Sequence, residues 1–105
     1  MLTTHQLTKL YEEGVSIIYR RNGLRGCSGL FDPGTLEATI YLPAPSPKER
    51  QITLLHELIH ARDGQKGARI FNTRLDDDVE KEAQQTFKKN PELIQFIVAL
   101  WKLPY

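Results

Sequence analysis

The sequence is short of several features that would each point to a class of protein. It contains one cysteine, Cys27, so no disulfide can form within the chain, and a reducing cytoplasm is the expected compartment. Basic residues number 14 and acidic residues 13, a net charge of +1 that gives no reason to expect nucleic acid or a membrane as a partner. From these absences we expect a cytoplasmic enzyme or binding protein.

Long apolar runs are also missing. No hydrophobic stretch approaches the length that spans a membrane, and the first residues lack the basic and apolar regions of a signal peptide. There is no low-complexity tract and no internal repeat. With 105 residues, 40% hydrophobic and 26% charged, the chain has an ordinary globular composition and room for one modest core. We therefore predict a single domain over residues 1–105.

What the sequence does contain is the stretch His-Glu-Leu-Ile-His, from His56 to His60. Histidines four apart project from the same face of a helix, so both imidazoles can bind one metal ion. Glu57, between them, points to the side, where it can act on a water molecule bound by the metal without being a ligand. On a helix, this motif predicts a zinc hydrolase.

The flanking residues favour that helix. Ser46 is suited to cap it, and Pro47 fits its first turn. Apolar residues then recur at helical spacing beside the histidines, and Gly64 is suited to end the helix. The motif therefore lies on a predicted helix of about four turns.

Before this helix the chain carries signals for one helix and two strands. Residues 3–14 predict a first helix, beginning with a possible capping box at Thr3. Residues 15–20 and 36–42 predict two strands that pair with each other. Residues 22–29 are rich in glycine and are predicted to turn.

After this helix we predict an irregular connection over residues 64–78 and another helix from about Val79. A last helix follows the break at residues 90–92, with Pro91 in its first turn. The expected fold is α+β. A small antiparallel sheet of two to three strands packs on the motif helix and the following helix, with further helices at both ends of the chain.

A catalytic zinc ion usually takes a third protein ligand and leaves one position for water. Glu80 lies 20 residues after His60 on the next predicted helix, and two antiparallel helices can bring it opposite the histidines. Glu82 points about 200° around that helix from Glu80, so only one of the two can face the metal. We favour Glu80 as the third ligand and keep Glu82 as the alternative.

These residues resemble the gluzincins, whose third zinc ligand is a glutamate on a downstream helix. The resemblance consists of His56-Glu57-x-x-His60 followed by Glu80-Lys81-Glu82-Ala83, and it covers about residues 36–90. The small size looks most like the minigluzincins, soluble relatives of the catalytic domains of integral-membrane metallopeptidases that include the CAAX-processing enzymes. The resemblance implies a minimal zincin fold, a Zn²⁺ cofactor and metallopeptidase activity.

One position departs from the family pattern. Many gluzincins have an aspartate four residues after the ligand glutamate, where it holds a zinc-bound histidine by its second ring nitrogen. Here that residue is Gln84. Its carbonyl can accept the same hydrogen bond but is neutral, which would make the histidine a weaker donor to zinc.

The C-terminal tail is unusually apolar for the end of a chain. Residues 102–105 include Leu103, Pro104 and Tyr105, where polar, fraying residues are commoner. Minigluzincins look similar in using C-terminal segments to maintain latency. Either the tail packs into the core, or, as the resemblance implies, it lies in the cleft and blocks the active site in a zymogen-like form.

The expected function is a zinc-dependent endopeptidase, in which Glu57 takes a proton from the water and delivers it to the leaving amine. A peptide substrate is expected to bind as an extended strand along the free edge of residues 36–42, where Tyr41 can hydrogen-bond a tetrahedral intermediate. The protein is expected to be a monomer, with Cys27 a structural thiol. Two alternatives stay open. One is a non-catalytic zinc-binding regulatory or interaction module that retains the zincin fold, and the other is an antirepressor-type protease partner.

Overall fold

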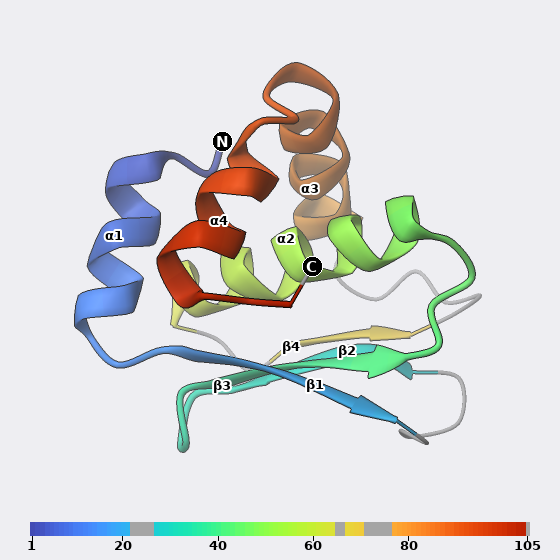
Figure 1. The fold of residues 1–105 in the computed structure, drawn as a ribbon, viewed down its shortest axis with the longest axis horizontal. Coiled ribbons are helices and arrows are strands. Elements are labelled where there is room, and N and C mark those ends of the chain that lie inside the picture. The colour runs from blue at the N-terminus through green and yellow to red at the C-terminus, as the bar shows by residue number, and fades with distance from the viewer. Residues whose placement is uncertain (22–26, 65–66, 71–76, 105) are drawn as a thin grey trace.

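The computed structural model describes residues 1–21, 27–64, 67–70 and 77–104. Within these residues the chain forms four helices and four strands, and the helices lie on one face of the sheet (Figure 1). In chain order the elements are α1 (Thr4–Glu12), β1 (Ser16–Arg21), β2 (Cys27–Asp32), β3 (Glu37–Leu42), α2 (Pro47–Asp63), β4 (Gly67–Ile70), α3 (Asp77–Lys89) and α4 (Leu93–Trp101). The predicted α+β class, with helices at both ends, is confirmed.

The sheet has four strands in the order β1-β3-β2-β4. β2 pairs antiparallel with β3 and with β4, whereas β1 pairs parallel with β3. The predicted pairing of the first strand with the strand at residues 36–42 is therefore confirmed. The predicted wholly antiparallel sheet of two to three strands is wrong in its strand number and in the direction of β1, because β2 and β4 lie where a turn and an irregular connection were expected.

The central position of β3 corrects the predicted substrate edge. β1 and β2 pair with its two sides, so β3 has no free edge to which a peptide could add. In the described part of the sheet, the two edge strands are β1 and β4.

Capping residues determine where the helices begin and end. Thr3 and Gln6 form a complete capping box at α1, as predicted. At α2 the Ser46 hydroxyl accepts a hydrogen bond from the Glu49 amide at 3.1 Å, and Gly64 ends the helix in the left-handed conformation with φ 68°. α4 begins at Leu93, two residues later than the proline had indicated.

The core lies between the sheet and the helices. On β2 and β3 the alternation of side chains turns Phe31, Ala38 and Ile40 toward the helices, and all three are buried. Every residue of α2 from 52 to 61 is buried. α2 packs against β2, β3 and β4 on one side and contacts α1 and α3. No helix in the described part of the chain is both long and apolar enough to cross a membrane.

Candidate metal centre

Three polar residues of α2 form a compact group inside the protein. His56, Glu57 and His60 expose 1%, 0% and 2% of their surface, and their potential ligand atoms all lie within 4.8 Å of one another. Two imidazoles and a carboxylate are costly to bury without a strong interaction among them. The group is therefore compatible with a bound metal ion, in agreement with the prediction that this motif lies on a helix.

The two histidines face each other through one nitrogen each. The Nε2 atoms of His56 and His60 are 3.2 Å apart, and the ring planes are inclined by 59°. Two nitrogens that bind the same tetrahedral zinc ion, each at 2.0–2.1 Å, would be about 3.3 Å apart. The distance between the histidines therefore fits a shared ion, and it also fits a single hydrogen bond between two neutral rings.

α3 brings Glu80, rather than Glu82, to the histidines. Glu80 Oε2 lies 3.9 Å from His56 Nδ1, the ring nitrogen that does not face His60. With a side chain 29% exposed, Glu80 forms the solvent-facing border of the group. A carboxylate beside the second nitrogen of a ligating histidine can orient its ring. The position of Glu80 is thus compatible with this role as well as with the predicted role of third ligand.

Glu82 is engaged elsewhere. Both of its oxygens accept hydrogen bonds from the Arg62 guanidinium, one of them from Nη2 at 3.0 Å, and the N-terminal amine lies 3.9 Å from Oε2. These hydrogen bonds raise the pKa of Arg62 above its ordinary value. The pair joins the end of α2 to α3, which helps to fix how α3 presents Glu80.

Two glycines of the sheet make room for the group. A Cβ atom placed on Gly67 of β4 would lie 2.1–2.2 Å from three atoms of the His60 ring. A Cβ atom on Gly29 of β2 would lie 3.0 Å from Glu57 Oε2 and 2.7 Å from the methyl carbon of Thr53. Sequence reasoning missed both glycines and also Arg62, because only the strand register shows which residues lie beneath the motif.

Cys27 lies near this group, although it is not one of its members. Its thiol donates a hydrogen bond to the Gly29 carbonyl at 3.0 Å. Burial raises the pKa of the thiol, the hydrogen bond to Gly29 lowers it, and the carboxylate of Glu57 raises it again, with a net upward shift. A protonated thiol agrees with the predicted structural role and is a poor zinc ligand.

The predicted transition-state contact at Tyr41 is wrong. Gly29, which lies beneath Glu57, pairs in register with Ile40, so Ile40 points to the same face of the sheet. Neighbouring residues of a strand point to opposite faces, and Tyr41 therefore points away from α2. It sits opposite Arg20 of β1 on the face that carries no described helix.

Gln84 occupies an exposed position on α3. It lines an open cavity of about 410 Å³ with Lys48, Gln85, Phe87 and Lys88, none of which belongs to the motif. An exposed amide would have to turn inward to reach a histidine ring. The carboxylate that lies near His56 Nδ1 is that of Glu80, at 3.9 Å, so the described residues show no contact that supports the predicted role of Gln84.

The C-terminal segment is anchored at the far side of the sheet. The indole of Trp101 donates a hydrogen bond to the carbonyl of Val15, the residue before β1, at 2.7 Å. Leu103 packs against the hydrophobic core, and Pro104 is exposed. The edge strand β1 is roughly 14 Å from β4 across three strand spacings. These contacts fix Trp101 beside β1 and pack Leu103 on the core, whereas the blocking role of the tail stays a prediction and Tyr105 lies outside the described residues.

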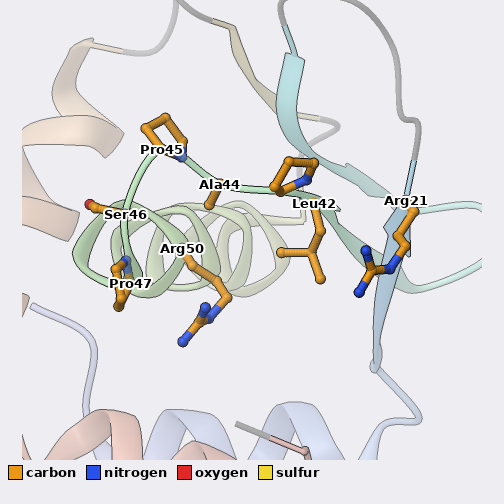
Figure 2. Close-up of a pocket in the computed structure, with 8 residues that line it drawn as sticks. Arg21, Leu42, Ala44, Pro45, Ser46, Pro47 and Arg50 are labelled. Carbon is orange, nitrogen blue, oxygen red and sulfur yellow. The ribbon is translucent and has the colours of Figure 1, made fainter.

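A basic cavity is found at the start of α2. It measures about 300 Å³ and is lined by Arg21, Leu42, residues 43–47 and Arg50. In Figure 2 the side chain of Leu42 lies between those of Arg21 and Arg50. Arg50 precedes His56 by six residues, or about 9 Å along the helix axis. This cavity is therefore separate from the metal centre.

Comparison of the chain with family models, with curated proteins and with solved structures gave no match.

Proposed function

We propose that this protein is a zinc-dependent endopeptidase of the gluzincin type, with the site built on the buried face of α2. The observation that carries the proposal is the 3.2 Å separation of the two Nε2 atoms, with a carboxylate from the same helix in the same group. Two imidazoles from one helix and a carboxylate from a neighbouring helix are a ligand set that zinc prefers, and Glu57 beside them can then act as the base. His56 and His60 are the proposed ligands, and Glu80 is the proposed third ligand.

A bound zinc ion would lower the pKa of a water molecule and polarise the carbonyl of the scissile bond. Glu57 is the proposed general base. Its carboxylate would accept a proton from the attacking water and then donate it to the leaving amine. Gly29 leaves room for one carboxylate oxygen, because a Cβ atom there would lie 3.0 Å from Glu57 Oε2.

The substrate in this proposal is a peptide in extended conformation. Because β3 is covered on both sides, the outer edge of β4 replaces it as the proposed docking edge. β4 begins at Gly67, against the ring of His60, so a peptide paired with β4 would pass close to the histidines. Glu80 is the most exposed of the four polar side chains and marks the side from which the peptide would enter.

A second function is favoured by burial. The exposed fractions of 1%, 0% and 2% leave little surface on which a scissile carbonyl could approach Glu57. A zinc ion in a closed site contributes folding free energy without catalysis. The competing proposal is therefore a zinc-binding regulatory or protein-interaction module that keeps this fold.

The test uses the matched isosteric variants Glu57→Gln and Glu80→Gln, each measured for zinc stoichiometry and for cleavage of an unfolded protein such as casein. If Glu57 is the base, Glu57→Gln keeps one zinc per chain and loses cleavage by at least about 100-fold. If Glu80 is a ligand, Glu80→Gln weakens zinc binding.

Loss of zinc from Glu57→Gln with retention in Glu80→Gln would reverse the roles of the two carboxylates. A wild-type protein that binds zinc stoichiometrically yet cleaves nothing would favour the non-catalytic module.

A further inference from the structure

The ring of His60 occupies space that a side chain on β4 would need. Gly67 pairs in register with Phe31 of β2, and its missing Cβ is replaced by the His60 ring. A Cβ atom placed on Gly67 would lie 2.1 Å from Cδ2 and 2.2 Å from Nε2 of that ring, far closer than real Cβ atoms come to other atoms. Nε2 is the atom that faces His56. Any side chain at position 67 would therefore displace the His60 ring, and Nε2 with it, from its present position.

Glu57 meets a similar restriction on β2. A Cβ atom on Gly29 would lie 2.7 Å from the methyl carbon of Thr53, one helical turn before Glu57, and 3.0 Å from both Glu57 Oε2 and the Thr39 carbonyl oxygen. The Thr53 hydroxyl donates to the Glu49 carbonyl at 2.8 Å, which holds the methyl group toward the sheet. Turning this methyl group away from the sheet would break that hydrogen bond, so a Cβ on Gly29 would press on the Glu57 carboxylate as well.

We propose that Gly67 and Gly29 are positioning residues with separate duties: Gly67 sets the His60 ring for metal binding, and Gly29 sets the Glu57 carboxylate for proton transfer. This proposal rests on the proposed function, in which His60 is a ligand and Glu57 the base. The two glycines lie on different strands and touch different side chains. Their substitutions should therefore separate metal affinity from hydrolysis.

The first experiment measures zinc affinity of the EDTA-treated full chain by competition with a chelator. Gly67→Ala should weaken zinc binding by about 10- to 100-fold, the range typical of changes that misorient a ligand. Gly34→Ala is the matched control, since a Cβ there would meet only Asp32 Oδ1 at 3.2 Å, and it should bind zinc as the wild type does. Equal affinities for Gly67→Ala and the wild type would overturn the assignment of Gly67.

The second experiment concerns Gly29→Ala, which should keep zinc affinity within about twofold and lower casein cleavage by at least about tenfold. Thr53→Ser is combined with it, because this change removes the methyl group and keeps the hydroxyl that bonds Glu49. The double variant should regain the part of the stability that is lost to the Thr53 contact, while cleavage stays low. Recovery of full cleavage in the double variant would show that Gly29→Ala lowers cleavage through its contact with Thr53 and not through Glu57. This result would overturn the assignment of Gly29.

A third measurement is independent of zinc and of catalysis. In the metal-free protein, the loss of stability caused by Gly67→Ala should largely vanish when His60→Ala removes the ring. The loss caused by Gly29→Ala should likewise shrink in combination with Glu57→Ala. Additive losses in both cycles would overturn the proposal even if the wild type proves to be an active zinc enzyme. If the wild type binds no zinc, the proposed function fails, whereas the cycles still decide whether the glycines hold these side chains.

Discussion

The two halves of the protein use the same layered fold in different ways. In the half formed by α1, α4 and β1, apolar side chains such as Leu7, Ile17 and Ile97 fill the space between helices and sheet. In the half formed by β2, β4, α3 and the motif face of α2, glycines leave space that histidine and glutamate side chains occupy. Apolar packing stabilises the first half. In the second half, polar side chains lie in the interior, where apolar packing would favour hydrophobic residues.

The difference indicates where stability and function can be separated. Burying apolar groups contributes roughly in proportion to area, and each methylene lost from such a core is costly. Burying imidazoles and a carboxylate costs free energy until they bind a partner. We therefore expect changes in the apolar half to lower stability without specifically changing the zinc site. In the polar half, removal of a histidine or glutamate side chain should alter zinc binding more than the metal-free stability.

The largest effect is expected from Leu7→Ala in the apolar half. Leu7 is fully buried on α1, so the change should lower the free energy of unfolding by about 2–5 kcal/mol, measured by urea denaturation. The folded fraction should still bind one zinc ion per chain. Loss of zinc from protein that is still folded would show that the two halves are not separable.

Removing a proposed ligand tests the polar half. At a free zinc concentration of 100 times the dissociation constant, zinc should stabilise the wild type by about 2.7 kcal/mol. His60→Ala should abolish this stabilisation, as measured by thermal unfolding with and without zinc. His5→Ala is the control, because His5 is exposed on α1 and should leave the zinc effect intact. An undiminished zinc effect in His60→Ala would place the ion elsewhere.

A smaller effect is expected at the ion pair that joins α2 to α3. The side chains of Arg62 and Glu82 are 20% and 23% exposed, so solvent screens the pair only in part. Arg62→Met should cost about 1 kcal/mol of unfolding free energy, and it should weaken zinc binding by letting α3 shift. Arg21→Met, which changes an exposed arginine on β1, should do neither. If both variants bind zinc equally well, the ion pair has no part in presenting Glu80.

The smallest effect concerns Cys27. Because burial raises its pKa, the metal-free folded protein at pH 8 should react with iodoacetamide several-fold more slowly than the urea-unfolded chain. The unfolded thiol loses its proton first, so the contribution of this group to folding stability should fall as the pH rises above about 8.5. Equal rates of alkylation in the folded and unfolded protein would contradict the shift.

Local signals predicted the elements that depend on local chemistry. Ser46, Pro47 and Gly64 marked the ends of α2 correctly, because caps act within one turn. β2 was missed because Gly29 made its segment resemble a turn, although pairing with β3 and β4 on both sides stabilises it as a strand. The parallel pairing of β1 with β3 depends on contacts between residues far apart in sequence, which strand signals do not specify.

The part of the site that lies on α2 was predictable from the sequence, whereas the contacts that α3 and β4 make with it were much less so. The spacing of His56 and His60 was enough to place both rings on one face of α2. The 20-residue spacing between His60 and Glu80 predicts that Glu80 lies near the histidines, whereas its approach to Nδ1 rather than Nε2 depends on how α3 packs. The place of Gly67 beneath His60 follows from the register of β4, a strand that the sequence did not indicate.

The central claim is that the buried group on α2 holds one zinc ion through its two histidines. X-ray absorption at the zinc edge, on protein loaded with one equivalent of zinc, tests it most directly. The account predicts a first shell of nitrogen and oxygen only, at about 2.0–2.1 Å, with the multiple-scattering signature of two imidazoles. A sulfur ligand at about 2.3 Å would place the ion on Cys27 instead and would contradict the account, as would a shell without imidazole.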